Sequence, residues 1–259
     1  MKQLTEQQAL RYSRHIMLPS MDLSGQEALL NAHVLIIGVG GLGCAVAQYL
    51  VAAGIGQITL VDDDTVENSN LQRQVLHTEL SVGENKAISA QQRLAALNSE
   101  CQINTITQRL TENELLSLVS SGGPYKPVSV IVDCSDNLAT RKQLNGISVV
   151  TQRPLVTGAA IRMEGQIVTY IPTSDHATES PCYACYSRLF GEQDLSCMEA
   201  GVLAPIVGIV GATQALEVTK LISNVADVTP GRLLLLDGAT LQWKTLVIKR
   251  YDQCSVCGN

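Results

Sequence analysis

The chain has 259 residues, 46% of them hydrophobic and 16% charged, so it can bury a substantial core and is too apolar for a disordered protein. Aromatic residues supply only 3%, and a core built on Val, Leu, Ile and Ala is typical of a buried parallel sheet covered by helices. A net charge of −6 without a Lys/Arg run predicts no nucleic-acid surface. The longest apolar stretch, 202–212, contains Pro and Gly, so we expect a soluble, cytoplasmic protein with no membrane segment.

Turn residues and apolar runs predict alternating helices and strands in the first part of the chain. An amphipathic helix over 5–18, with Leu10 and Ile16 at apolar positions, precedes a buried strand at 34–37. The later elements follow in this order: helix 44–53, strand 58–62, helix 86–97, strand 102–107, helix 112–119, strand 130–133, helix 137–149 and strand 154–157. This alternation predicts an α/β fold with a Rossmann-like, doubly wound, mostly parallel sheet.

The pattern changes after Gly158. Residues 165–171 alternate as an antiparallel strand does, and a small-residue helix and two strand-like runs follow, at 205–222, 233–236 and 245–248. We therefore predict a C-terminal antiparallel extension within a single domain, 1–259. Residues 1–158 form its nucleotide-binding part, and residues 159–259 hold the substrate and a metal.

A glycine-rich turn lies between the first strand and its helix. Gly38, Gly40, Gly41 and Gly43 form a GxGxxG pattern, which lets the backbone approach a phosphate and directs the N–H groups of the next helix at it. Asp62, at the end of the next strand, stands where a carboxylate accepts hydrogen bonds from ribose hydroxyls. These features predict a nucleotide site, and alone they favour an NAD-dependent oxidoreductase as much as any other enzyme.

Three charged residues farther along favour ATP that is cleaved at its α-phosphate. Arg73 and Lys86 would stabilise the charge that grows on departing pyrophosphate. Asp136 follows a strand at the carboxyl edge of the sheet and is a natural Mg²⁺ ligand. The alternative is that Arg73 and Lys86 are solvated surface charges and that Asp136 caps the helix after it.

Eight cysteines in a cytoplasmic chain do not predict four disulfides. Cys182 and Cys185 form one CxxC pair and Cys254 and Cys257 another, and four thiolates describe a closed, structural zinc site. A redox-active CxxC is the competing interpretation, but such a pair opens a helix after a strand, and we expect neither pair to do so. Three other thiols are expected to be small buried residues: Cys44, Cys101 and Cys134.

Together, these motifs resemble the ubiquitin-activating-enzyme-like adenylyltransferases, in particular the MoeB/ThiF family of bacterial sulfur-carrier activators. The resemblance runs from Arg11-Tyr12-Ser13-Arg14 to the last cysteine pair, and its most specific segment is Asn70-Leu71-Gln72-Arg73-Gln74. It implies that the C-terminal glycine carboxylate of a small ubiquitin-like sulfur-carrier protein attacks the α-phosphorus of Mg·ATP. The products are an acyl-adenylate and pyrophosphate, and a separate sulfur donor then replaces AMP to leave a thiocarboxylate.

The resemblance also implies roles for single residues. Arg14 matches an N-terminal arginine that reaches the ATP of the partner subunit in a homodimer. Cys197 matches a thiol that bonds covalently to the carrier in some members and is dispensable in others. The four paired cysteines match a structural zinc site, and Asp136 matches the Mg²⁺ ligand. The implied ATP site comprises Gly38, Gly40, Gly41, Gly43, Asp62, Ser69, Asn70, Gln72, Arg73, Lys86, Asp136 and Asn137.

Two different carriers are compatible with this hypothesis. Segments 158–166 and 187–192 resemble the molybdopterin branch, whereas 237–238 and 242–244 resemble the thiazole branch. We expect the small subunit of molybdopterin synthase, in molybdenum cofactor biosynthesis, with the thiazole carrier as the alternative. Three other functions stay open: an NAD-dependent oxidoreductase, a non-catalytic carrier-binding scaffold, and an enzyme that adenylates a different peptide in cyclisation or antibiotic maturation.

Overall fold

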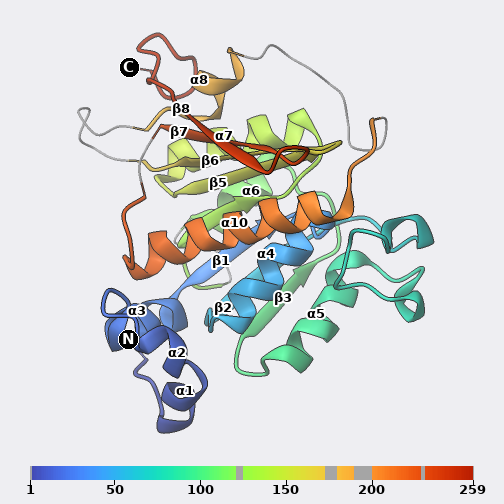
Figure 1. Ribbon diagram of the computed structural model, residues 1–259, viewed down its shortest axis with the longest axis vertical. Helices are drawn as coiled ribbons and strands as arrows, with labels where there is room; N and C mark the ends of the chain where they lie inside the picture. The colour runs from blue at the N-terminus through green and yellow to red at the C-terminus, as the bar shows by residue number, and fades with distance from the viewer. Residues whose placement is uncertain (1, 121–124, 173–179, 190–199, 229–230, 259) are drawn as a thin grey trace.

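The structure is a computed structural model of the chain, and it describes residues 2–120, 125–172, 180–189, 200–228 and 231–258 (Figure 1). Its centre is one eight-stranded sheet in the order β3-β2-β1-β4-β5-β6-β7-β8. The first five strands in this order are parallel: β3 (Gln102–Ile106), β2 (Gln57–Val61), β1 (His33–Ile37), β4 (Val130–Asp133) and β5 (Leu155–Ile161). The remaining three are antiparallel: β6 (Glu164–Tyr170), β7 (Arg232–Asp237) and β8 (Gln242–Val247). The predicted fold class is confirmed.

Helices cover both faces of the sheet. Along β1, Val34 and Ile36 belong to one apolar cluster, and Leu35 and Ile37 belong to another. The first cluster packs under α3 (Asp22–Asn31), α4 (Gly41–Ala52), α5 (Lys86–Leu97) and α10 (Ala204–Ser223). The second packs under α6 (Glu112–Val119) and α7 (Leu138–Thr151). Because side chains alternate along a strand, a continuous apolar run such as β1 supplies both layers.

The helix starts differ in a way that bears on function. Asn85, Thr111 and Asn137 each accept backbone N–H groups with a side-chain oxygen and thereby cap α5, α6 and α7. By contrast, α4 begins after Gly40 with no side-chain cap. The first N–H groups of a helix have no partner within it, so α4 presents donors at the carboxyl edge of the sheet.

The N-terminal segment differs from its prediction. Instead of one helix over 5–18, there are two, α1 (Glu6–Arg11) and α2 (Ser13–Ile16). The break falls at Tyr12, which is buried and whose hydroxyl accepts a hydrogen bond from Asn98. Leu10 is 77% exposed, so its expected position on an apolar face is wrong. Helix α3 was not predicted, because its sequence mixes polar and apolar residues without clear periodicity.

Smaller differences occur elsewhere. Helix α4 starts at Gly41 rather than Cys44, and the last strand covers Gln242–Val247 rather than 245–248. Two 3-10 turns, η1 (Asn68–Asn70) and η2 (Glu79–Ser81), lie between β2 and α5. Helix α10 is long and apolar enough to span a membrane by length and composition alone. It packs along α4 with Val207 and Val210 in the core, as the central helix of a folded domain does.

Candidate active site

A cavity of about 1540 Å³ lies at the carboxyl ends of the parallel strands. There, β1 continues into α4 on one face of the sheet, and its neighbour β4 continues into α7 on the other. Neighbouring strands whose connections leave on opposite faces open a crevice, which is where doubly wound folds bind ligands. The cavity is lined by every expected nucleotide-binding residue except Gly43: Gly38, Gly40, Gly41, Asp62, Ser69, Asn70, Gln72, Arg73, Lys86, Asp136 and Asn137.

The glycine-rich turn contains two glycines that the backbone itself requires. Gly38 has φ +89°, and a Cβ there would lie 2.7 Å from the carbonyl oxygen of Cys134. A Cβ on Gly43 would lie 2.0 Å from the carbonyl oxygen of Gly38. Gly43 therefore allows α4 to pack against the turn and does not line the cavity, whereas Gly40 does line it.

Asp62 holds the turn in place from the end of β2. Its Oδ2 accepts a hydrogen bond from the N–H of Val39 at 2.6 Å, and its Oδ1 accepts one from the N–H of Asp64 at 3.0 Å. Burial raises the pKa of Asp62, and these two hydrogen bonds oppose that rise. Each carboxylate oxygen has two lone pairs, so Asp62 retains the capacity to accept a ribose hydroxyl.

The two expected cations both line the cavity. Lys86 is the first residue of α5, and its Nζ lies 2.9 Å from Oδ2 of Asp64. Its side chain is only 9% exposed, so its interpretation as a solvated surface charge is wrong. The Nη1 of Arg73 donates to the carbonyl of Ser69 at 3.2 Å, which holds its guanidinium beside the η1 turn.

Asp136 is exposed on the wall of the cavity just beyond β4. The cap of α7 is Asn137, whose side-chain oxygen accepts the N–H of Thr140 at 2.9 Å. The alternative role of Asp136 as that cap is therefore wrong. An exposed carboxylate beside a candidate phosphate site suits Mg²⁺, which keeps several waters and takes one or two carboxylates along with substrate phosphates.

Sequence reasoning assigned no role to two buried residues of the cavity wall. Gln74 is 4% exposed, and its Oε1 makes no hydrogen bond to the part of the chain that the structure describes. The Nη2 of Arg141 donates to the carbonyls of Ser135 (2.8 Å) and Gly158 (3.0 Å), which ties the loop after β4 to β5. The sequence could have indicated Arg141, because it lies four residues after Asn137, an expected nucleotide-binding residue. Residues four apart lie on the same side of a helix, here α7.

Arg14 does not line this cavity. Arg14 lies on α2, and the neighbouring Arg11 donates to the carbonyl of Leu97 at the carboxyl end of α5. Helix α5 runs back from the carboxyl edge of the parallel strands, so its far end lies at the opposite edge from the cavity. Cys197 falls within 190–199 and lies outside the described residues.

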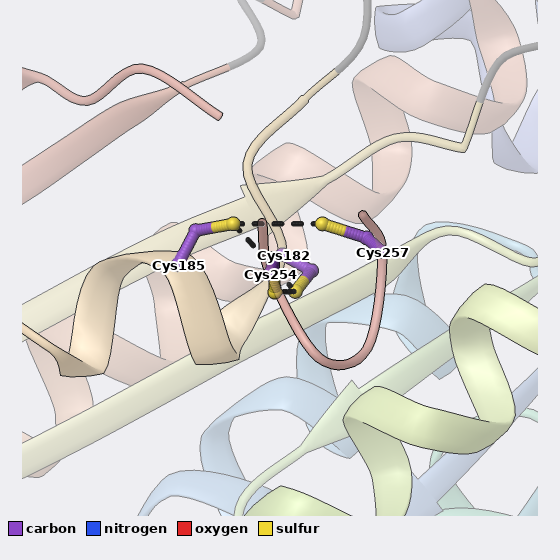
Figure 2. Close-up of side chains that lie close together, drawn as sticks. All are labelled: Cys182, Cys185, Cys254 and Cys257. Carbon is purple, nitrogen blue, oxygen red and sulfur yellow. Dashed lines mark hydrogen bonds between the residues drawn. The ribbon is translucent and has the colours of Figure 1, made fainter. Parts of the chain in front are cut away.

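The four paired cysteines lie together, as Figure 2 shows. Their Sγ atoms are all within 4.8 Å of one another, with Cys182 3.7 Å from Cys254 and Cys185 3.5 Å from Cys257. All four side chains are buried. Four converging thiols with no other ligand type are the donor set of a closed tetrahedral zinc site, so these residues fit that ion.

The surroundings also suit a metal. The Nδ2 of Asn145 lies 3.6 Å from the Sγ of Cys182, and the N–H of Tyr251 lies 3.5 Å from that of Cys185. Such N–H donors stabilise metal-bound thiolates. A hydrogen bond from Cys182 lowers the pKa of Cys185. Cys182 precedes a helix, α8 (Tyr183–Ser187), but β6 ends at Tyr170, so this pair does not open a helix directly after a strand. Cys185 also lies among four thiols rather than in an isolated redox pair.

Comparison with known proteins gives four consistent results. Residues 12–256 match the model of the ThiF family. The chain is 44% identical to the molybdopterin-synthase adenylyltransferase of Salmonella typhimurium over the full length of both proteins. It is 40% identical to the sulfur carrier protein ThiS adenylyltransferase of Escherichia coli, with 98% of this chain and 97% of that protein covered. Among solved structures, E. coli MccB with ATP aligns with a TM-score of 0.80 at 25% identity, covering 96% of this chain and 74% of that one.

Proposed function

Because the chain belongs to the ThiF family, we propose that it is an ATP-dependent adenylyltransferase whose substrate is the C-terminal glycine carboxylate of a small ubiquitin-like sulfur-carrier protein. The observation that carries this proposal is the single cavity in which the glycine-rich turn, Lys86 and Asp136 meet. A solved neighbour that aligns across 96% of this chain was captured with ATP. The family match also counts against an NAD-dependent oxidoreductase.

In the proposed reaction a carboxylate oxygen of the carrier attacks the α-phosphorus of ATP. The bond from the α-phosphorus to the bridging oxygen breaks, and pyrophosphate leaves with its electrons. A carboxylate is already ionised at neutral pH, so no general base is needed, and catalysis consists of positioning and charge stabilisation. Arg73 and Lys86 stabilise the phosphates, and Asp62 accepts from the ribose.

Two metal ions complete the proposal. Asp136 would hold Mg²⁺, which would neutralise charge on the phosphates. The four cysteines would hold zinc as a structural ion, which joins α8 to the segment around Cys254 and Cys257. Zinc has no place in the chemical step, because its four thiolates leave no coordination position for substrate.

The cavity is large enough for a second substrate. Binding sites for small molecules typically measure about 300–1,000 Å³, whereas this one measures about 1540 Å³. Beyond the nucleotide-binding residues its lining continues to Arg162, Tyr186 and Lys244. We assign this second half to the extended C-terminal tail of the carrier, which must reach the α-phosphate.

The molybdopterin carrier is the first candidate substrate. A molybdopterin-synthase adenylyltransferase is 44% identical to the chain, and a ThiS adenylyltransferase is 40% identical. The two identities are close, so the thiazole carrier is the second candidate. We further propose that the protein is cytoplasmic and forms a homodimer in which Arg14 acts across the interface. A separate sulfur donor would then replace AMP on the carrier, and the thiol of Cys197 would lie near the carrier terminus.

The decisive experiment is ATP–pyrophosphate exchange by the purified chain with each purified carrier. Exchange that needs the molybdopterin carrier and Mg²⁺ is the expected result. Exchange with the thiazole carrier alone would reassign the substrate. No exchange with either carrier would overturn the activation of sulfur carriers and would leave adenylation of a different peptide as the function to test.

A further inference from the structure

The peptide groups on both sides of Val39, inside the glycine-rich turn, are held by side chains from later segments. The N–H of Val39 donates to Asp62 at 2.6 Å. The carbonyl oxygen of Val39 lies 3.0 Å from the Nε2 of His77, which follows the η1 turn. The side chain of Val39 is itself fully buried, so the residue is fixed on every side.

The contacts of His77 define its protonation. Val39 offers only a carbonyl oxygen, so the Nε2 of His77 must carry the hydrogen. The Nδ1 then accepts from the hydroxyl of Ser89, on α5, at 2.9 Å. Burial lowers the pKa of His77, in agreement with a neutral ring. Cys44 also points its thiol at the same carbonyl, at 3.4 Å, but a thiol is a weak donor.

This hydrogen bond has a geometric consequence at the next residue. A trans peptide is planar, and its C=O and N–H groups point in opposite directions. The described residues contain no cis peptide. When His77 draws the carbonyl of Val39 inward, the N–H of Gly40 is turned outward, and Gly40 lines the cavity. Glycine has little conformational preference of its own, so this peptide needs an outside restraint.

We propose that His77 is a positioning residue: by donating to the carbonyl of Val39, it orients the Gly40 N–H as a hydrogen-bond donor to a phosphate of the bound nucleotide. This inference rests on the proposed function, because it takes ATP as the occupant of the cavity. His77 acts through the backbone of the turn and does not itself line the cavity.

Two substitutions of His77 separate this role from packing. In H77Q the side-chain amide nitrogen reaches about as far as Nε2 and retains the donor to Val39. In H77N it reaches only to the position of Nδ1, and that donor is lost. H77N leaves the buried carbonyl of Val39 without its donor, so we expect it to bind Mg·ATP roughly tenfold more weakly than the unaltered chain. H77Q keeps the donor and should bind Mg·ATP within about twofold of the unaltered chain.

His33 provides the matched control. It is fully buried and bonded at both nitrogens, to the carbonyl of Lys126 and the hydroxyl of Thr59, but it stands at the first residue of β1, away from the cavity. We expect H33N to lower the thermal midpoint as H77N does while leaving Mg·ATP affinity unchanged. Adenosine, which lacks phosphates, should bind H77N as it binds the unaltered chain.

The measurement is titration calorimetry of the full chain with Mg·ATP, together with competition by adenosine. Equal affinity of H77N and the unaltered chain would overturn the inference, and so would parallel losses for ATP and adenosine. If H77N does not fold, S89A removes the hydroxyl that holds the Nδ1 of His77, and it should weaken Mg·ATP binding about two- to fivefold. If the unaltered chain binds no Mg·ATP, the proposed function fails together with the inference about His77. If it binds Mg·ATP and H77N binds equally well, only the inference about His77 fails.

Discussion

The Nζ of Lys86 lies 2.9 Å from Oδ2 of Asp64, in an ion pair that joins a buried lysine to an exposed carboxylate. The side chains are 9% and 70% exposed. Water screens the exposed partner, so Asp64 contributes little to stability, whereas the lysine is directed into the cavity. Its charge is thus available to phosphates without an unpaired cation in the wall.

The first prediction follows from this asymmetry. K86M should reduce ATP–pyrophosphate exchange by at least about 100-fold, because it removes a charge that stabilises the departing pyrophosphate. D64N should stay within about threefold, since it leaves the lysine in place. Initial rates at saturating carrier measure both. Equal losses in the two variants would show that the ion pair, rather than the lysine, matters.

The second prediction concerns Asp136, the carboxylate proposed to hold Mg²⁺. D136N should abolish Mg²⁺-dependent exchange and leave the thermal midpoint unchanged, because Asp136 is exposed and does not cap α7. D63N is the matched control, since Asp63 is also exposed and lines the cavity. The reverse pattern, with D63N inactive and D136N active, would move the metal to the group formed by residues 62–64.

The third prediction tests the cysteine cluster. C185S should remove the bound zinc and lower the free energy of unfolding by more than about 4 kcal/mol, because loss of a structural metal is among the largest single-residue effects. C101S changes a buried thiol outside the cluster and should retain the metal. Elemental analysis and urea unfolding report the two quantities. A metal-free unaltered chain of full stability would exclude the zinc site.

The fourth prediction is a pH dependence of stability. Burial lowers the pKa of His33 below its ordinary value of 6.5. Below about pH 6.5 the imidazole is therefore protonated more readily in the unfolded chain than in the folded chain. Stability should therefore be complete above pH 6.5 and fall as the pH drops below it, by up to about 1.4 kcal/mol per pH unit for this group.

H33Q should make that acid loss smaller, as measured by urea unfolding at pH 7.0 and 5.5. His77 shares the same direction of shift, so some of the loss remains in H33Q. H15Q is the control, since His15 lies on the exposed N-terminal helix α2 and is only partly buried. An unchanged slope in H33Q would show that the ring titrates equally in the folded and unfolded chains.

The fifth prediction tests whether Arg14 acts on a partner subunit. R14A and K86M should each be inactive alone. After mixing and exchange of subunits, about one quarter of the sites would combine an intact Arg14 with an intact Lys86, so roughly a quarter of the activity should return. Exchange assays on the mixture measure it. Mixed subunits that stay inactive would place Arg14 in the site of its own subunit, and an R14A variant that is active alone would place Arg14 outside both sites.

Much of the candidate site could be predicted because its signals are local. A buried strand, a glycine-rich turn and an acidic residue at the end of the next strand together form a recognisable pattern, and all three lie between Val34 and Asp62. Topology then brings Asp136 to the same edge, because parallel strands end together. The role of Asn137 as the cap of α7 was less accessible, since Asp and Asn are both good caps and only the backbone decides between them.

Other features depend on contacts that sequence patterns do not encode. The break at Tyr12 reflects a hydrogen bond with Asn98, 86 residues away. Asp62 and His77, from different segments, both form hydrogen bonds with the backbone of Val39. Nothing in the sequence around His77 distinguishes it from a histidine that is simply buried in the core. The helix after Cys182 was missed because five residues are too few to show a period.

The cysteine cluster also has a consequence for the order of events during synthesis. Its two halves are separated by 68 residues that include α10, β7 and β8. A ribosome adds about 5–20 residues per second, so the first pair waits several seconds for the second. During that interval Cys182 and Cys185 can offer a metal only two ligands. Four-coordinate capture would require Cys257 to have emerged as well, so the binding of a metal would follow the synthesis of the parallel strands.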